Sequence, residues 1–394
     1  MARTALVVGG GVAGPATALA LHRAGIDATV HEAYAAPSDG VGVTLSIAPN
    51  GLSALEIVGA ADAVRAIGQP ITRAVMHDGR GRTIGTFPGL RGLPPSLALW
   101  RDDLCRALRE RAAGQGIETR FGERLVGAEE DPDGVTALFA DGTTARADIL
   151  VGADGIGSTV RTLIDPAAPG PQATRLLNFG AAADVTLPAD PSTMFFAFGK
   201  RGFLGYWAQP DGRTAWFANV PHAAMTSAEA RETPRAEWLD RLRDIYSDEI
   251  PAAKILTATD PEALTVLGSM QDMPKVPRWH RGRMVLVGDS AHAPSSSSGQ
   301  GASMAVESAV ELARCLRDIP APEAAFTAYE RLRRARVEKV IDRGAKANTT
   351  KTLGPFAKTM MRLTLPILTR TLLNPERTLG PEQRHTINWK APAP

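Results

Sequence analysis

Residues 4–32 read TALVVGGGVAGPATALALHRAGIDATVHE, and this stretch decides the fold. A short apolar run from Thr4 to Val8 leads into glycines, then into residues 15–25 with helical apolar spacing, and a second apolar run ends at Glu32. A strand, a G-x-G-x-x-G turn, a helix and a second strand ending in an acidic residue form the unit that binds dinucleotides. The stretch predicts a Rossmann-like α/β fold with a dinucleotide at its first turn.

The spacing assigns a reason to each glycine. Gly9 permits the tight turn, Gly11 lets the backbone approach a pyrophosphate, and Gly14 allows the helix to lie close to the strand. The cofactor contacts predicted in this turn are Gly9, Gly11, Val12, Ala13 and Gly14. Glu32 is expected to accept hydrogen bonds from an adenosine ribose, and an acid at this position favours NAD or FAD over NADP.

Two later strands end in similar turns. Residues 146–161, RADILVGADGIGSTVR, contain an apolar strand followed by Asp154, and residues 283–289, RMVLVGD, contain another followed by Asp289. Val160 stands at the third glycine position of the former, so it is not a second complete fingerprint. Three strands that end near residues 8, 153 and 288 predict one long ligand across the carboxyl edge of a single sheet. This arrangement favours FAD over NAD.

The stretch GDSAHAPSSSSGQGAS, residues 288–303, allows three interpretations. Asp289, Ser290 and His292 have the residue types of a hydrolase triad, and the serine run resembles a flexible linker. A triad needs its histidine between serine and acid, whereas consecutive residues leaving a strand point in diverging directions. The third interpretation, a cofactor-binding turn that opens a helix, agrees with the other two turns.

Composition excludes several classes of function. The chain has 394 residues, 44% of them hydrophobic, and a net charge of +2, which gives no basic footprint for nucleic acid. No apolar run reaches the roughly 20 residues of a membrane span, and no secretory signal is visible. The seven histidines show no metal-ligand spacing, so no metal site is expected. Cys105 and Cys315 are expected to be reduced core thiols in a cytoplasmic monomer or homodimer.

The ordered set of motifs resembles the class A flavoprotein monooxygenases, the single-component FAD-dependent hydroxylases of the para-hydroxybenzoate and salicylate hydroxylase type. The glycine turn with Glu32, Asp154-Gly155, and Gly288-Asp289 followed by Pro294 and Gly299-Gln300-Gly301 carry the resemblance. Further matches are GVGVTLSIAPNGLSAL at 40–55, LWRDDLCRAL at 99–108, GQGASMAVESAVELARCL at 299–316 and YERLRRARV at 329–337. The resemblance extends from residue 4 to about 345.

The resemblance implies roles for the matched residues. Arg101 would contact FAD, Asp289 the ribityl or pyrophosphate region, and Asp154 would support the fold and a transient nicotinamide site beside FAD. Pro294 would shape the turn. Backbone groups would be presented to the isoalloxazine edge by Gly299, Gln300, Gly301 and Ala302. The family commonly has alanine and asparagine where this chain has Ser290 and Ser303. The run Ser295–Ser298 departs from the less polar residues common there and is left without a role.

The predicted organisation has two interleaved domains and a tail. Residues 1–70, 98–175 and 277–345 are expected to form the FAD-binding domain, including a β-meander within 118–150. Residues 71–97 and 176–276 are expected to form a sheet-based substrate domain, and residues 346–394 a helical tail that packs back across both.

Aromatic residues mark the expected substrate sheet. Eight of the chain's 21 aromatic residues lie within residues 195–217. Alternation along a strand sends neighbours to opposite faces, so part of this cluster should line an apolar pocket beside the flavin. Phe196, Tyr206 and Trp216 are the residues predicted to do so.

The resemblance implies an enzyme that hydroxylates or epoxidises an apolar, aromatic or polyketide-like small molecule. NADH or NADPH would reduce FAD transiently, and dioxygen would reach the substrate through a flavin 4a-hydroperoxide. No residue is singled out as a catalytic base. A related FAD-dependent reductase, dehydrogenase or halogenase without oxygen insertion is the alternative; WFANVP at 216–221 echoes a halogenase signature, but Ala218 replaces its second tryptophan.

Overall fold

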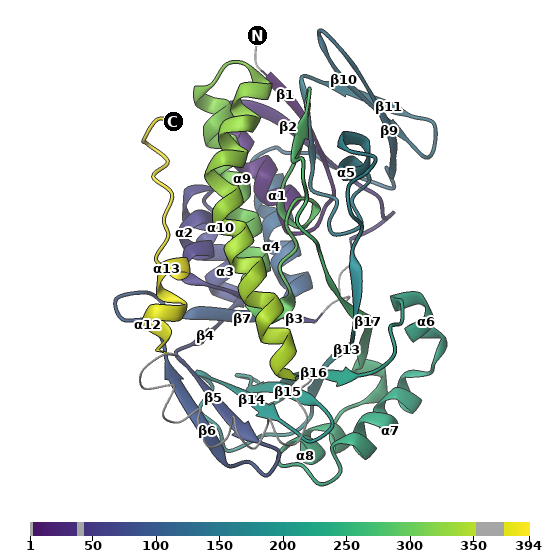
Figure 1. Cartoon of the computed structure of the whole chain (residues 1–394), viewed down its shortest axis with the longest axis vertical. Coiled ribbons are helices and arrows are strands. Elements are labelled where there is room, and N and C mark those ends of the chain that lie inside the picture. Colours follow the sequence, from purple (N-terminus) through teal and green to yellow (C-terminus); the bar gives the residue numbers. More distant parts are fainter. Residues whose placement is uncertain (1–2, 38–42, 352–373) are drawn as a thin grey trace.

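The structure, a computed structural model, describes residues 3–37, 43–351 and 374–394. Figure 1 shows two main parts, a six-stranded sheet with long helices beside it and a seven-stranded sheet below. A small three-stranded sheet lies between them, formed by β3 (Thr44–Ile47), β7 (Ser96–Trp100) and β4 (Gln69–Ile71). The chain is of mixed α/β class, as predicted.

The six-stranded sheet is built around the N-terminal strand. Its strands in spatial order are β18 (His280–Arg281), β19 (Met284–Leu286), β12 (Ile149–Gly152), β1 (Arg3–Val8), β2 (Ile26–Glu32) and β8 (Thr119–Phe121). All neighbouring pairs are parallel except β18 and β19. The carboxyl ends of β1, β12 and β19 therefore meet at one edge, which confirms that their three glycine-bearing turns lie at the edge of a single sheet.

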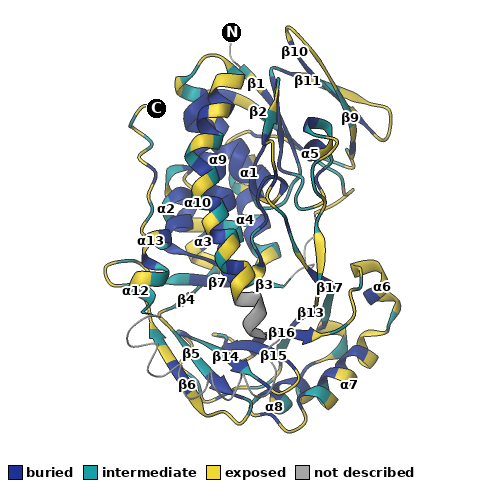
Figure 2. Cartoon of the chain, viewed as in Figure 1, coloured by how far each residue is buried: buried dark blue, intermediate teal, exposed yellow. Residues whose placement is uncertain are grey.

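Helices pack beside this sheet and against one another, and their apolar residues belong to one shared core. They are α1 (Ala13–Arg23), α2 (Pro49–Ile57), α3 (Ala61–Ile67), α4 (Arg101–Ala113), α5 (Thr159–Ile164), α9 (Gly301–Asp318) and α10 (Pro322–Lys351). Figure 2 shows α9 buried along most of its length, whereas α10 alternates between buried and exposed residues. Helix α9 is thus the central helix of this part, held between α1, α2 and α10.

The expected β-meander is present on the flank of the six-stranded sheet (Figure 1). It consists of β9 (Leu125–Asp131), β10 (Gly134–Phe139) and β11 (Thr144–Ala147), paired antiparallel in the order β11-β10-β9. The meander lies within residues 118–150, as predicted, and its turns fall at Asp- and Gly-containing stretches.

The seven-stranded sheet has the spatial order β17-β13-β16-β15-β14-β5-β6. Its strands are β5 (Arg73–Asp78), β6 (Thr83–Pro88), β13 (Gln172–Ala183), β14 (Thr193–Phe198), β15 (Phe203–Ala208), β16 (Thr214–Pro221) and β17 (Thr265–Asp272). Three helices, α6 (Ser227–Glu232), α7 (Arg235–Ile245) and α8 (Ala252–Thr257), lie in the same part of the molecule. Residues 71–97, which were expected to belong to this sheet, contribute the antiparallel pair β5 and β6.

The C-terminal segment runs back along the helices of the six-stranded sheet (Figure 1). After α12 (Pro375–Thr378) and α13 (Gly380–Gln383) the chain is extended. The guanidiniums of Arg314 and Arg317 on α9 donate to the carbonyls of Trp389, Ala391 and Pro392. Residues 352–373 of the helical tail that was expected to pack across both domains lie outside the described residues.

Two features are absent from residues 3–37, 43–351 and 374–394. No helix there has both the length and the hydropathy that a membrane crossing requires. Within the same ranges, no group of three or more histidine, cysteine, aspartate or glutamate side chains is arranged to hold a metal ion.

Candidate functional site

The glycine turn after β1 is packed too tightly for side chains at two of its three positions. Gly9 has a φ of +110°, and a Cβ there would lie 2.4 Å from the carbonyl oxygen of Ala153. A Cβ at Gly14 would lie 1.8 Å from the carbonyl oxygen of Gly9. At Gly11, by contrast, the nearest atom to a Cβ would be the guanidinium of Arg101 at 3.6 Å. The loop is therefore closed on its protein side and open beside Gly11, as a cradle for a pyrophosphate requires.

Glu32 lies at the end of β2 beside this turn. Its Oε2 accepts a hydrogen bond from the Gly10 amide at 2.5 Å, and its Oε1 accepts one from the Tyr34 amide at 2.9 Å. Each carboxylate oxygen retains a second lone pair for another donor. The position fits the expected ribose contact.

Arg101 and Asp289 approach the same turn from opposite elements. Arg101 begins α4, while Asp289 follows β19 in a short 3-10 turn, Gly288–Ser290. Asp289 keeps an exposed surface, yet enough protein surrounds it that desolvation raises the pKa of its carboxyl to about 6, against the opposing effect of Arg101. A Cβ at Gly288 would lie 2.8 Å from the Cβ of Ala13 on α1 and 3.3 Å from that of Ala305 on α9. These close approaches bring the first and third turns and the start of α9 into one region.

Asp154 organises the second turn from within. Its carboxylate accepts hydrogen bonds from the Ser158 hydroxyl and the Val160 amide, and Ser158 in turn caps the N-terminus of α5. Burial raises the pKa of Asp154 despite these bonds, which lower it. The buried Arg161 then connects this turn to the third one by donating to the Ser290 carbonyl at 3.1 Å. These contacts give Asp154 a role in supporting the fold.

The stretch 294–302 forms the junction before α9. Gly299 has a φ of +62° and ends a 3-10 turn, Ser296–Ser298, after which Gln300 is the N-cap of α9. Pro294 lies beside the start of the helix, 4.0 Å from where a Cβ of Gly301 would stand. Gly301 and Ala302 form the first turn of α9 and are only partly buried. This backbone opens α9, whereas the side chain of Gln300 is fully buried.

The serines of this region have structural partners that sequence reasoning missed. Ser290 is completely buried and donates to the Gly152 carbonyl at 2.6 Å, which joins the β12 and β19 turns. Ser303 accepts from the Ala48 amide at 3.0 Å, at the start of α2. Ser295 caps the 3-10 turn, and the Ser298 hydroxyl accepts from the Gln300 amide at 3.1 Å. Ser295 therefore stabilises the 3-10 turn, and Ser298 stabilises the junction between that turn and α9.

The two faces of the seven-stranded sheet have different surroundings, and this corrects part of the substrate prediction. Tyr206 and Trp216 face the core that includes Trp238 and Leu242 of α7 and Ile255 of α8. Tyr206 is 4% and Trp216 0% exposed, and the Trp216 indole donates to Thr259 at 3.0 Å. Both were predicted to line a pocket beside the flavin, but strand alternation points them away from the six-stranded part.

The opposite face carries the aromatic residues that remain candidates. Phe196, on this face by alternation along β14, stacks with Phe203 at 6.0 Å between ring centroids. Phe203 also contacts Phe217, which packs in one cluster with Trp207 of β15 and with Ala98 and Trp100 at the β7 end of the neighbouring sheet. The polar members of this face on β13 and β16 are Asn178 and Asn219, whose amides are joined by a hydrogen bond of 3.2 Å.

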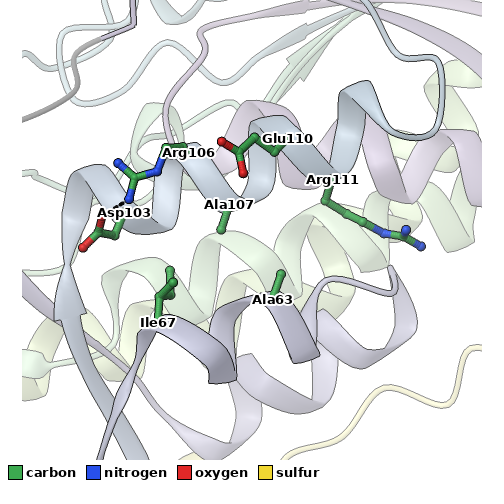
Figure 3. Close-up of a pocket in the computed structure, with 7 residues that line it drawn as sticks. All are labelled: Ala63, Ile67, Asp103, Arg106, Ala107, Glu110 and Arg111. Atoms are coloured by element: carbon green, nitrogen blue, oxygen red, sulfur yellow. Dashed lines mark hydrogen bonds and ion pairs between the residues drawn. The ribbon is translucent and has the colours of Figure 1, made fainter.

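A shallow groove between α3 and α4 lies apart from these residues (Figure 3). It is lined by Ala63, Ile67, Asp103, Arg106, Ala107, Glu110 and Arg111, and Asp103 and Arg106 form an ion pair along α4. No residue that the sequence predicted for cofactor or substrate is among them. The groove is therefore not assigned to the site.

Comparison with known proteins agrees with this geometry. The model of the FAD binding domain family matches residues 2–344. The FAD-dependent urate hydroxylase of Klebsiella pneumoniae is 31% identical over 87% of this chain and 88% of its own. The 3-amino-4-hydroxybenzoate 2-monooxygenase PtnB3 of Streptomyces platensis is 32% identical over 85% of each chain.

A solved structure supports the same assignment. Klebsiella pneumoniae HpxO, complexed with FAD and uric acid, superposes with a TM-score of 0.83 at 26% identity and covers 97% of this chain and 96% of its own. The glycine turn, the clustering of three strand ends and these matches lead to one assignment. The chain belongs to the FAD binding domain family and is a class A flavoprotein monooxygenase.

Proposed function

We propose that the protein is an NAD(P)H-consuming, FAD-dependent monooxygenase that hydroxylates or epoxidises an apolar aromatic or polyketide-like small molecule. The aromatic face of the seven-stranded sheet, opposite the cofactor turns, is the observation that carries the proposal. In the balanced reaction, substrate, dioxygen, NAD(P)H and one proton give the oxygenated substrate, NAD(P)⁺ and water.

The residues at the three turns fit FAD. Gly9, Gly11 and Gly14, with Val12 and Ala13, would hold the pyrophosphate at the N-terminus of α1. Glu32 would bind the adenosine ribose, and Arg101 and Asp289 the middle of the cofactor. The amides of residues 299–302 would meet the isoalloxazine edge, where the positive end of the α9 dipole stabilises negative charge on the reduced ring.

Bound FAD would supply the chemistry, accepting a hydride from NAD(P)H and passing one oxygen atom of dioxygen to the substrate. The protein's own contribution is to orient the substrate and to exclude water. Phe196, Phe203 and Phe217 would hold a flat apolar molecule by stacking. Asn178 and Asn219 would offer it amide hydrogen-bond donors and acceptors in place of a charge.

The proposal also assigns FAD binding and substrate binding to different parts of the chain. Residues 1–70, 98–175 and 277–345 would bind FAD, and residues 71–97 and 176–276 the substrate. NADH or NADPH would bind transiently, since one complete dinucleotide fingerprint serves FAD alone.

A coupled assay tests the proposal. The purified protein should have the yellow spectrum of FAD, and a panel of neutral aromatic compounds should be screened for stimulation of NADH or NADPH oxidation in air. We expect neutral planar compounds to stimulate oxidation more than aromatic carboxylates of equal size. Equal or stronger stimulation by the carboxylates would refute the proposed substrate class.

The alternative is a related FAD-dependent reductase, dehydrogenase or halogenase without oxygen insertion. A reductase or dehydrogenase would convert its substrate equally well without dioxygen, and a halogenase would require halide. Running the same panel anaerobically and with added chloride or bromide separates these activities from monooxygenation.

A further inference from the structure

The side chain of Gln300 is turned into the protein, although its backbone opens the helix assigned to the flavin. Gln300 is 1% exposed, and its Oε1 accepts a hydrogen bond from Nδ2 of Asn50 at 3.0 Å. Its backbone carbonyl accepts the Met304 amide at 2.8 Å, the first hydrogen bond of α9. The side chain therefore anchors the residue from which α9 begins.

Asn50 connects this anchor to a buried charge. It lies in the first turn of α2, is 1% exposed, and its Nδ2 also donates to Oε1 of Glu307 at 2.7 Å. A carboxylate only accepts hydrogen bonds, so Glu307 requires the amino group of Asn50 on its side. That amino group has a second N–H, which the Gln300 carbonyl oxygen receives. The charge of Glu307 thus determines which way both amides point.

Glu307 is itself fixed by two arginines of α10. Arg333 donates to its Oε2 at 2.6 Å, and Arg336 donates to both oxygens at 2.9 and 2.8 Å. Burial alone would raise the pKa of Glu307, but the two guanidiniums outweigh it and lower the pKa to about 2. Glu307 and Arg333 are each 1% exposed.

A buried ion cluster is seldom the most stable way to fill such a space, because desolvation offsets much of its attraction. Apolar residues of similar volume would serve packing alone. The hydrogen bonds of this cluster instead run through Asn50 to Gln300, the N-cap residue of α9. They therefore fix the orientation of the Gln300 side chain.

We propose that Glu307, acting through Asn50, is a positioning residue that holds Gln300 and thereby sets the first turn of α9 against the isoalloxazine ring of FAD. This rests on the proposed function only in placing the ring at that turn. The expected consequence is electrostatic, because a displaced helix N-terminus stabilises the negatively charged reduced flavin less well.

The test compares the reduction potential of bound FAD in matched variants, without any substrate. Asn50→Ala removes the amide that joins Glu307 to Gln300 and leaves the ion cluster of Glu307 with its two arginines intact. Gln300→Met removes the side-chain carbonyl that accepts from Asn50, at similar side-chain volume. Each should lower the affinity for reduced relative to oxidised FAD by about tenfold, a shift of about 30 mV to more negative potential for a two-electron couple. The double variant should shift no further than either single one, since both remove the same link.

Glu311→Gln is the control. It breaks another buried ion pair of α9, Glu311 with Arg314 at 2.8 Å, one turn beyond Glu307. It should lower the Tm while leaving the flavin potential and visible spectrum as in the parent protein. The proposal is overturned if both Asn50→Ala and Gln300→Met keep the parental potential, if their effects add, or if Glu311→Gln shifts the potential equally.

Two safeguards keep the outcome clear. If Asn50→Ala does not fold, Gln300→Met alone decides, because it leaves the hydrogen bond from Asn50 to Glu307 and the two arginine contacts of Glu307 in place. Failure of the proposed function would appear in the parent protein, as absence of bound FAD or of oxygen insertion, and does not depend on these variants.

Discussion

At the scale of single residues, Gly14 is the most constrained position of the cofactor turn. A Cβ there would stand 1.8 Å from the Gly9 carbonyl oxygen, so Gly14→Ala must displace the backbone of the turn. Overpacking of this kind costs about 1–3 kcal/mol or more. We expect a lower Tm and at least tenfold weaker FAD binding, measured by fluorescence titration.

Gly157→Ala is the matched control, because a Cβ at Gly157 meets no atom within 4 Å. It should bind FAD as the parent does. Equal FAD affinity for Gly14→Ala and the parent would show that the turn does not hold the cofactor.

His292 gives a prediction about pH. It is 1% exposed, and burial together with the positive charge of Arg333 lowers its pKa to about 3. An imidazole with a lowered pKa binds its proton more readily in the unfolded chain, so its contribution to stability is complete above pH 6.5 and is lost as pH falls toward 3. Between these values one such group reduces the free energy of unfolding by up to about 1.4 kcal/mol per pH unit.

His292→Gln keeps a polar side chain near Ser308 but does not titrate in this range. The free energy of unfolding of the variant should therefore fall less steeply with acid than that of the parent, as denaturant titrations at several pH values would show. Parallel curves for the two proteins would mean that His292 is not held neutral in the fold.

Sequence reasoning was most successful where a residue's constraint is local. Gly9 and Gly14 could be predicted because the turn itself demands them. Ser290 and Asn50 could not be, since their partners, Gly152 and Glu307, are 138 and 257 residues away and depend on the folded arrangement.

At the scale of elements, strand β16 shows why the substrate residues were only partly predictable. Alternation was evident from the sequence, so Trp216 and Phe217 had to face opposite sides. Which side meets the cofactor depends on where α7 and α8 pack, and that requires the tertiary structure. Tyr206 and Trp216 therefore lie on the face that packs against α7 and α8, contrary to the prediction, while Phe196 lies on the other face.

Adjacent variants on β16 test this correction. Phe217→Leu should raise the KM for a stimulating aromatic compound by about tenfold, equivalent to about 1.4 kcal/mol of lost contact, with little change in Tm. Trp216→Phe should instead lower stability by about 2 kcal/mol, through the lost hydrogen bond to Thr259 and reduced packing, and leave KM unchanged. A raised KM for Trp216→Phe together with an unchanged KM for Phe217→Leu would show that Trp216, and not Phe217, lines the substrate pocket.

At the scale of the whole molecule, the C-terminal segment contacts helices α1 and α9 and stabilises their packing. The ring of Trp389 lies between two guanidiniums, 5.6 Å from Arg23 on α1 and 4.7 Å from Arg317 on α9. Sequence patterns gave no sign of this contact, because it joins residues near both ends of the chain.

Trp389→Ala should lower the free energy of unfolding by about 2 kcal/mol, from lost cation–π contacts and apolar burial. Lys390→Ala, at the exposed neighbouring position, is the control and should change stability by less than about 0.5 kcal/mol. Indistinguishable denaturation midpoints for the two variants would show that the C-terminal segment does not stabilise the packing of α1 and α9.

The layout of the whole molecule also leads to its central claim. Three strand ends gather at the open glycine turn, α9 begins beside them, and an aromatic sheet face lies opposite. Under the proposed function, this layout would place a bound flavin beside the apolar molecule that accepts an oxygen atom.

The most direct measurement is isotope incorporation under ¹⁸O₂, with NAD(P)H and the most stimulating aromatic compound. We predict a product that gains one ¹⁸O atom for each NAD(P)H consumed, and none when ¹⁶O₂ and ¹⁸O-labelled water are used instead. A product without oxygen from dioxygen, or NAD(P)H consumption that yields only hydrogen peroxide across the whole panel, would contradict the assignment.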